Sequence, residues 1–121
     1  MKVYYNSACP VCRAGIEESQ CRLREQGAGA EVEWVDVHAE PQRVQEVGEE
    51  LEWVREQLHV RGSDGSLHVG ADAIAELFSQ TRGRRWLAKL MRLPLIRQLA
   101  RFCYDGLARG LYHWNRRKGR W

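Results

Sequence analysis

Apolar residues in the first part of the chain follow two periodicities, which predict a short strand and then a helix. Residues 2–5 are rich in β-branched and aromatic side chains, as in a buried strand. Pro10 suits the first position of a helix, because its fixed φ is already helical and no needed N–H is lost there. Ile16 and Leu23 then recur at helical spacing, so we expect a helix over residues 10–26.

The next stretch predicts a second strand and a second helix. Residues 31–37 begin with alternating polar and apolar positions and end apolar, which favours a strand. Pro41 follows as a helix start, and Gly48 is an expected break. The apolar stripe of this helical stretch consists of Val44, Val47, Leu51 and Val54.

A β-hairpin is expected next, because Asp64 and Gly65 separate two short apolar runs at residues 58–61 and 66–69. This dipeptide favours a two-residue type I′ turn. In the register that such a turn imposes, one face carries Leu58, Val60, Leu67 and Val69, and the other carries His59, Arg61 and His68.

The remaining sequence predicts three further helices. Asp72 suits the N-cap of the first, which continues to Phe78. Two more helical stretches follow from Arg84 and are separated near Pro94. The last has an apolar stripe, in which Cys103 is expected to behave as a small hydrophobe; the stripe consists of Leu95, Leu99, Phe102, Cys103 and Leu107.

The predicted order of elements is β-α-β-α-β-β-α followed by additional C-terminal helices, which is typical of a thioredoxin-like α/β protein. The helix between the first two strands implies that they are parallel, whereas the hairpin is antiparallel. A chain of 121 residues favours a single domain. We expect a thioredoxin-like core over residues 1–81 and a basic helical extension, residues 82–121, packed on the same domain.

Composition indicates a water-soluble protein. The chain is 44% hydrophobic and 29% charged, and it has no run of 18 apolar residues. Its N-terminus lacks the long apolar stretch of a secretory signal, so we expect a cytoplasmic protein. In that compartment the four cysteines are not expected to form a disulfide scaffold.

Charge divides the chain into two unlike parts. Residues 1–81 carry 7 basic and 15 acidic residues, whereas residues 82–121 carry 12 basic residues and the single acid Asp105. The basic tail is expected to pack on the acidic core with its charges solvated. Peripheral attachment to an anionic membrane surface is an alternative, because aromatic residues are interleaved with the cations. Nucleic acid is the least favoured partner, since no binding motif accompanies the tail.

The strongest chemical signal is the pair Cys9 and Cys12, which follows a strand and flanks Pro10 at a helix start. Unpaired N–H groups and the positive helix dipole stabilise a thiolate at this position. Cys9 is expected to attack, because an N-cap side chain is the more exposed of the two. Cys12 is expected to resolve the mixed disulfide. The sequence therefore predicts an enzyme, a thiol–disulfide oxidoreductase that needs no bound cofactor.

Three alternatives to catalysis stay open. The pair can be structural, or it can serve as a redox sensor in a binding module that uses the basic tail. It can also contribute to a metal site, although a structural zinc site needs four ligands and only one pair is present. Cys21 projects from the other side of its helix, and the four histidines show no paired spacing. A metal site of that kind would have to be shared across a dimer.

Several other residues are candidates for supporting roles. Arg13 can favour a thiolate, but its place in the helix also suits solvent exposure. Asp36 ends a central strand and can either transfer protons or cap a loop. His59 can shuttle protons if its strand enters near the cysteine loop, and otherwise it is a partly buried structural histidine. Cys21 is expected to be a surface thiol.

The sequence resembles the DCC family of thiol–disulfide oxidoreductases over most of its length. The similarity rests on residues 5–12, which read YNSACPVC, on 58–60 followed by 64–65, and on 70–73. Residues 93–96, Tyr104 and Ala108 extend it into the tail. The resemblance implies a thioredoxin-like fold, a redox pair at Cys9 and Cys12, and a protein or small-molecule thiol or disulfide as substrate.

Two positions depart from the pattern that the resemblance implies. The family usually has an aspartate three residues before its first cysteine, where this chain has Asn6. An asparagine can hydrogen-bond but cannot move a proton. Thioredoxins also place a cis-proline before the strand that faces the active site, and residues 56–58 contain no proline.

Overall fold

Four short strands form one mixed sheet. The structure, a computed structural model, describes residues 1–27, 32–48, 50–62, 64–81 and 83–119. The spatial order is β2-β1-β3-β4, in which β1 is parallel to β2 while β3 is antiparallel to both β1 and β4. The predicted parallel pair and antiparallel hairpin are therefore confirmed. The strands are β1 (Lys2–Tyr5), β2 (Glu33–Asp36), β3 (His59–Arg61) and β4 (Leu67–Val69).

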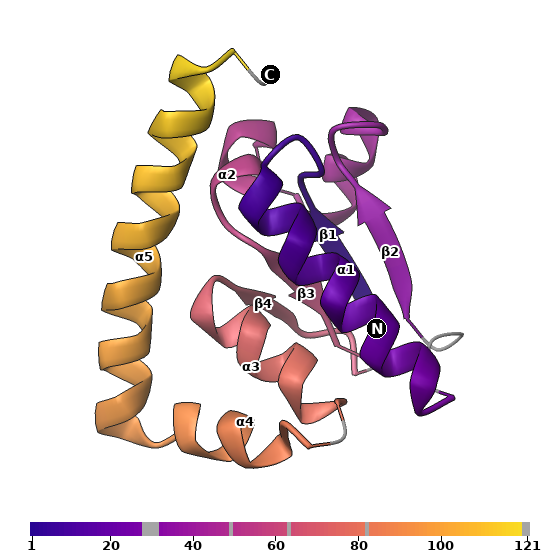
Figure 1. Cartoon of the computed structure of the whole chain (residues 1–121), viewed down its shortest axis with the longest axis vertical. Helices are drawn as coiled ribbons and strands as arrows, with labels where there is room; N and C mark the ends of the chain where they lie inside the picture. The colour runs from indigo at the N-terminus through magenta and orange to yellow at the C-terminus, as the bar shows by residue number, and fades with distance from the viewer. Residues whose placement is uncertain (28–31, 49, 63, 82, 120–121) are drawn as a thin grey trace.

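The described residues form six helical segments around this sheet (Figure 1). Gly48, with φ of 69°, is the predicted break. It ends the helical segment of residues 41–47 and separates it from the segment of residues 51–56. The protein is thus of mixed α/β class, with an element order compatible with a thioredoxin-like fold. Position 31 of the predicted second strand, and positions 82 and 120–121 of the predicted extension, lie outside the described residues. The segments are α1 (Pro10–Glu25), the 3₁₀ helix η2 (Pro41–Val47), α2 (Leu51–Glu56), α3 (Ala71–Ser79), α4 (Arg85–Met91) and α5 (Pro94–Arg117).

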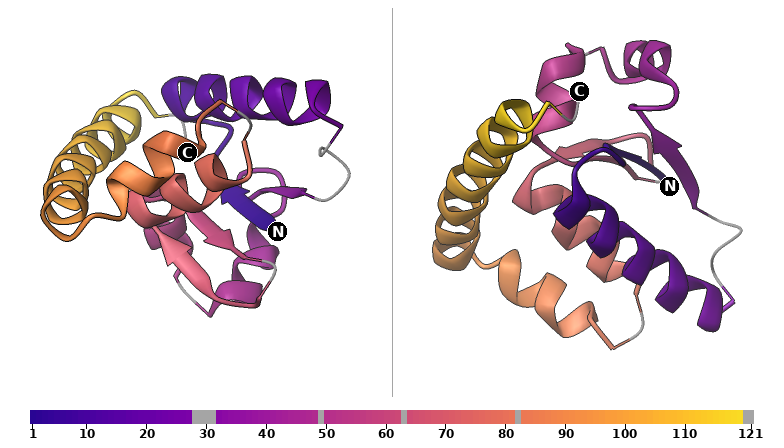
Figure 2. Two further views of the ribbon diagram at one scale, coloured as in Figure 1. Left: turned by 90° about the horizontal axis from the view of Figure 1, so that it is seen from below. Right: turned by 45° about the horizontal axis from the view of Figure 1, so that its top comes forward.

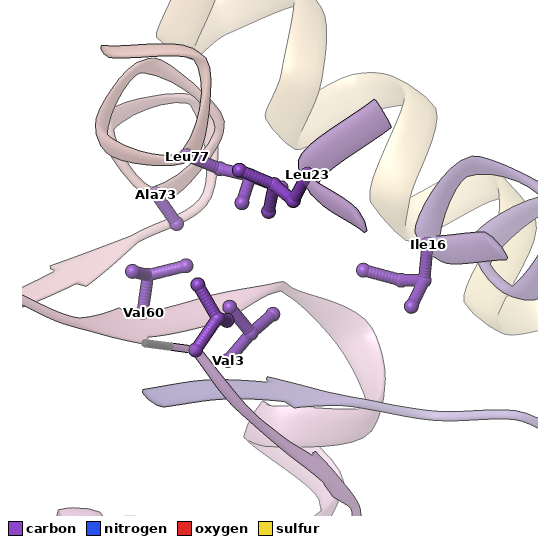
Figure 3. Close-up of a cluster of buried hydrophobic side chains, with 7 residues drawn as sticks. Val3, Ile16, Leu23, Val60, Ala73 and Leu77 are labelled. Atoms are coloured by element: carbon purple, nitrogen blue, oxygen red, sulfur yellow. The ribbon is translucent and has the colours of Figure 1, made fainter. Parts of the chain in front are cut away.

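The sheet buries apolar side chains on both faces, because successive residues of a strand point in opposite directions. Val3 and its cross-strand neighbour Val60 face α1 and α3. Figure 3 shows how Ile16 and Leu23 of α1 and Leu77 of α3 lie over them. On the opposite face, Tyr4, Val35 and Val37 pack with Val47 of η2 and Val54 of α2.

The hairpin register differs from the prediction by one residue. Val60 lies opposite His68, and Arg61 lies opposite Leu67. The turn closes between Gly62 N–H and Ser66 C=O, at 2.8 Å, which leaves three residues between them instead of two. A one-residue change in register moves each side chain to the other face. His68 therefore shares a face with Val60, and Leu67 shares one with His59 and Arg61.

The start of α3 also differs from the prediction. Gly70, and not Asp72, occupies the N-cap position, and Asp72 lies in the first turn of the helix. Its carboxylate instead accepts hydrogen bonds from Arg97 and Arg101 of α5. Burial raises the pKa of Asp72, but these two guanidinium groups outweigh burial and hold that pKa below its usual value. Asp72 thus ties α5 to α3.

Helix α5 packs against α2, α3 and α4 with the opposite side to the one expected. The predicted apolar stripe faces solvent, since Leu95 and Phe102 are 80% and 79% exposed and Cys103 is exposed as well. Cys103 is therefore not a buried hydrophobe. The three views in Figures 1 and 2 show α5 at the periphery, with no element on its outer side. Its inner side carries Tyr104, Ala108, Leu111 and Asn115.

Part of the basic tail pairs with acids of the core. Besides the contacts of Asp72, Arg92 lies 3.0 Å from Glu76, and Arg84 contacts Glu18. Glu52 of α2 contacts both Arg116 and the hydroxyl of Tyr112 near the end of α5. The acidic and basic parts of the sequence are thus partly matched within one fold. No helix in the described part of the chain has the length and apolar character needed to cross a bilayer.

Candidate active site

Cys9 occupies the N-cap of α1, as predicted. Its backbone is extended, and Pro10 begins the helix at the first position. The Cys9 sulfur accepts a hydrogen bond from the backbone N–H of Cys12, with an N–S distance of 3.4 Å. The thiol therefore takes the place of the oxygen that usually caps a helix, and it lies at the positive end of the helix dipole.

The two thiols of the pair differ sharply in acidity. A hydrogen bond from the side chain of Cys12, opposed by burial and assisted by the backbone N–H groups of Cys12 and Val11, lowers the pKa of Cys9 to about 6. The same hydrogen bond, together with burial, raises the pKa of Cys12 above that of a free thiol. The arrangement therefore favours a Cys9 thiolate that accepts a hydrogen bond from the protonated Cys12 thiol.

Cys9 is expected to be the attacking thiol because it is the more exposed of the two, and this exposure argument is wrong. Cys9 is only 1% exposed, whereas Cys12 is partly exposed. Asn115 of α5 lies beside Cys9, which sequence periodicity did not predict. Acidity, and not accessibility, is what distinguishes Cys9.

Asn115 is the site residue that sequence reasoning missed. It lies near the end of α5, is 1% exposed and lines the pocket beside Cys9, and its side-chain amide lowers the pKa of Cys9. An amide N–H that donates to sulfur stabilises the thiolate over the thiol. The only signal in the sequence is the inner face of α5, where residues at positions 104, 108, 111 and 115 follow helical spacing and end in an asparagine.

A pocket of about 280 Å³ lies between α1 and α5 beside the cysteine pair. Its wall is largely apolar, with contributions from Ile16, Leu77, Phe78 and Leu111. Asn6, Cys9, Cys12 and Asn115 are among its other lining residues. A reacting thiol or disulfide that enters this pocket meets both sulfurs of the pair.

Asn6 is brought to the site, as predicted. It is 3% exposed, and its Oδ1 accepts a hydrogen bond from the Ala8 N–H at 3.1 Å, while its backbone oxygen accepts one from the Cys9 N–H at 3.3 Å. These bonds shape the loop that carries Cys9. Within the described ranges no acceptor lies within hydrogen-bonding distance of its Nδ2.

Asp36 and Arg13 lie outside the pocket lining. The Asp36 carboxylate accepts backbone hydrogen bonds from Ser7 at 3.2 Å and His38 at 3.0 Å. Burial raises the pKa of Asp36, but a hydrogen bond from the Ser7 side chain, with backbone bonds from Ser7, His38 and Ala39, outweighs it and keeps the pKa below its usual value. The contacts support the loop-capping interpretation. Arg13 is exposed and lies 3.8 Å from Glu17 on the same helix, so it points to solvent.

His59 is not brought to the cysteine pair. It is fully buried beside Tyr4 on the sheet face that packs with η2 and α2, opposite to the face covered by α1. Its Nδ1 lies 2.9 Å from the Gln57 carbonyl oxygen, and its ring meets Trp53 edge to face. These contacts agree with the structural interpretation of this histidine.

The other two cysteines lie away from the pair, and both are exposed. The Cys21 thiol donates to Glu25 one turn further along α1. Among residues 1–27, 32–48, 50–62, 64–81 and 83–119, no three His, Cys, Asp or Glu side chains are grouped closely enough to hold a metal ion. In this part of the chain, no third His, Cys, Asp or Glu side chain therefore lies close enough to the cysteine pair to complete a metal site.

Removing the Asn115 amide should make Cys9 less acidic. In Asn115→Ala we expect the Cys9 pKa to rise from about 6 to about 7, since a hydrogen bond to a charged group contributes roughly 1.5–3 kcal/mol. The pH dependence of Cys9 alkylation measures this shift, and it would not move if the role of Asn115 were merely structural. His113→Ala, an exposed change on the same turn, should leave the profile in place.

The fold and the site define the class of protein. A helix N-terminus holds one activated thiol, and a second thiol lies one turn further on, which is the arrangement used for thiol–disulfide chemistry. The family model described as DCC1-like thiol-disulfide oxidoreductase matches residues 3–117. The chain belongs to this family. No curated protein and no solved structure gives a significant match.

Proposed function

We propose that this protein exchanges a dithiol for a disulfide through Cys9 and Cys12, with a protein or a small thiol as its partner. The observation that carries the proposal is the capped sulfur of Cys9, whose pKa is lowered to about 6 within contact of a second thiol. Because a thiolate is the nucleophile in disulfide exchange, Cys9 is the group ready to attack at neutral pH.

The reaction proceeds in two displacements. The Cys9 thiolate attacks one sulfur of the substrate disulfide, and the other sulfur leaves as a thiolate and takes up a proton. The Cys12 thiol then loses its proton and attacks the Cys9 sulfur, which releases the second substrate thiol. Two electrons pass to the substrate, which is reduced, and the pair becomes a disulfide. An external thiol or dithiol reductant restores the pair by the reverse sequence.

The thioredoxin-like assignment is part of this proposal. The mixed four-stranded sheet and the cysteine pair after β1 support it. The described residues contain no cis peptide bond, so the substrate backbone does not dock on a cis-proline here. The pocket between α1 and α5 offers a different place for the substrate, next to both sulfurs. Asn6 occupies the position of the family's usual acid, so the proton released by Cys12 passes to the leaving thiolate or to solvent.

The test is the rate of alkylation at each cysteine as a function of pH, followed by mass spectrometry. The alkylation rate of Cys9 should have its midpoint near pH 6, whereas Cys12 should react only at a pH above the pKa of an ordinary thiol. The midpoint and not the absolute rate is decisive, since Cys9 is buried. Cys21 and Cys103, both exposed, serve as internal references. A Cys9 profile that coincides with these references would overturn the proposal.

A redox sensor without turnover is the main alternative on the same pair. Both functions would form a Cys9–Cys12 disulfide in a glutathione buffer, but only the enzyme would reduce many substrate disulfides per molecule. Elemental analysis of protein purified without chelator addresses the metal alternative. Stoichiometric zinc, with both thiols protected from alkylation, would replace the redox interpretation.

A further inference from the structure

The exposed large hydrophobic residues are concentrated on one part of the molecule. Ten such residues are exposed in the described part of the chain, and eight of them lie on α4, on α5 or at Leu93 between the two helices. A soluble monomer rarely leaves such side chains gathered on one surface without a binding role. The eight are Trp86, Leu90, Leu93, Leu95, Leu99, Phe102, Leu107 and Trp114.

On α5 these side chains follow helical spacing and form a single face. We define the outer face of α5 by Leu95, Leu99, Phe102, Leu107 and Trp114. The opposite side of the same helix packs on the core, and together with Leu107 it lines the cysteine pocket. The outer face runs along a convex helix of 24 residues, about 36 Å long at 1.5 Å per residue.

The charges around this face all have one sign. Arg109 lies at its edge, and Arg117 and Lys118 lie at its C-terminal end; all three are exposed, and none forms an ion pair with the described residues. On α4, Arg85 and Lys89 accompany Trp86 in the same way. Asp105, the one acid of residues 83–119, is engaged by Gln57 at 3.0 Å. The complementary partner is therefore anionic as well as apolar.

A second copy of this chain fits the face poorly. In a symmetric dimer each partner presents the same patch, so Arg109 and Arg117 of both copies would meet without an acid to separate them. A nucleic acid would match the cations but not the leucine and phenylalanine side chains at the centre. An apolar helix face bordered by arginine and lysine suits an anionic bilayer surface. The apolar side chains enter the boundary between headgroups and acyl chains, and the cations contact the anionic headgroups.

We propose that the outer face of α5 binds an anionic membrane surface, with α5 lying in the plane of the bilayer. The contact goes beyond the redox function, because only Leu107 of its five residues also lines the pocket. It places the pocket on the side of α5 turned away from the lipid.

Cys103 and Cys21 provide a matched pair of probe positions. Cys103 lies within the outer face, and Cys21 lies on α1 far from it, and both are exposed. An environment-sensitive fluorophore is attached at Cys103 in a chain that carries Cys9→Ser, Cys12→Ser and Cys21→Ser. The control carries the dye at Cys21, with Cys103→Ser in place of Cys21→Ser. Since neither chain has the redox pair, the result is independent of the proposed reaction.

Vesicles of phosphatidylcholine with phosphatidylglycerol are compared with vesicles of phosphatidylcholine alone. We expect a blue shift of the dye at Cys103 on the anionic vesicles only, weakened by added salt, and no comparable shift at Cys21. Phe102→Glu should reduce partitioning about tenfold or more, because it removes a large apolar anchor. Arg109→Glu should reduce it about fivefold or more, whereas Arg24→Glu, an equal charge change on α1, should have a smaller effect.

Three results would overturn the proposal. One is the absence of any shift at Cys103 on anionic vesicles. Another is an equal response at Cys103 and Cys21, which would indicate adsorption without a defined face. The third is a shift at Cys103 that depends on protein concentration in the absence of vesicles, which would identify a second copy as the occupant.

Discussion

Cys9→Ser should lower the rate of disulfide reduction by about a hundredfold or more. A serine hydroxyl cannot form the mixed disulfide, so attack would fall to Cys12. Burial, which does not depend on Cys9, still raises the pKa of Cys12 in this variant, and at most about 1% of a thiol with the ordinary pKa of 9.0 is ionised at pH 7. The measurement is turnover of insulin disulfides with dithiothreitol as the terminal reductant, at matched protein concentration.

Cys12→Ser should fail at a different step. Cys9 can still attack, but no second thiol remains to release the substrate, so the mixed disulfide at Cys9 should accumulate and be visible by intact mass. Cys21→Ser and Cys103→Ser are the matched controls, and each should retain the wild-type rate. Wild-type turnover in Cys9→Ser, or a stable mixed disulfide on any cysteine other than Cys9, would contradict the assigned roles.

The cysteine site could be predicted from the sequence because its main determinants are local. A strand, a short loop and Pro10 lie within a few residues of Cys9, and together they place its sulfur at a helix N-terminus. Asn115 is more than a hundred residues away in the sequence. Its contact with Cys9 depends on how α5 packs on the core. Helical periodicity identifies the apolar face of a helix, but it does not identify the element that packs against that face.

The choice of face on α5 shows where hydrophobic periodicity is insufficient. The stripe from Leu95 to Leu107 is the more apolar, yet the side that packs on the core combines Tyr104, Ala108 and Asn115. The hydroxyl of Tyr104 accepts a hydrogen bond from the backbone N–H of Leu58 at 2.9 Å, and its burial raises its pKa to about 12. Specific polar contacts of this kind fix the helix, and they are invisible in an apolar pattern.

The hairpin error has a simpler physical cause. Asp64 and Gly65 match a two-residue type I′ turn, which requires positive φ at both central residues. Only Gly65 has a positive φ, at 86°, and Asp64 does not. The turn is therefore of the longer kind with one left-handed glycine. The prediction placed the turn at the correct residues but made it one residue too short. Because the turn length sets the strand pairing, the predicted register was wrong as well.

Gly70→Ala should destabilise the protein by about 2–4 kcal/mol, combining backbone strain with overpacking. Gly70 has φ of 69° and ψ of −130°, a conformation in which a side chain is strongly disfavoured. A Cβ there would lie 2.9 Å from Gln57 Oε1 and 3.2 Å from the Tyr104 ring. Because Tyr104 and Gln57 hold α5 against the segment between α2 and β3, their displacement should also move Asn115 and raise the pKa of Cys9.

Gly110→Ala is the matched control for this substitution. Gly110 lies in α5 without a positive φ, and an added Cβ would meet no atom within 4 Å. Alanine stabilises a helix interior by roughly 0.5–1 kcal/mol relative to glycine, so this variant should gain stability. Urea unfolding and the pH profile of Cys9 alkylation are measured together for both variants. If Gly70→Ala unfolds at the wild-type urea concentration, or if it loses stability while the Cys9 profile stays unchanged, α5 is not coupled to the cysteine pair through Tyr104.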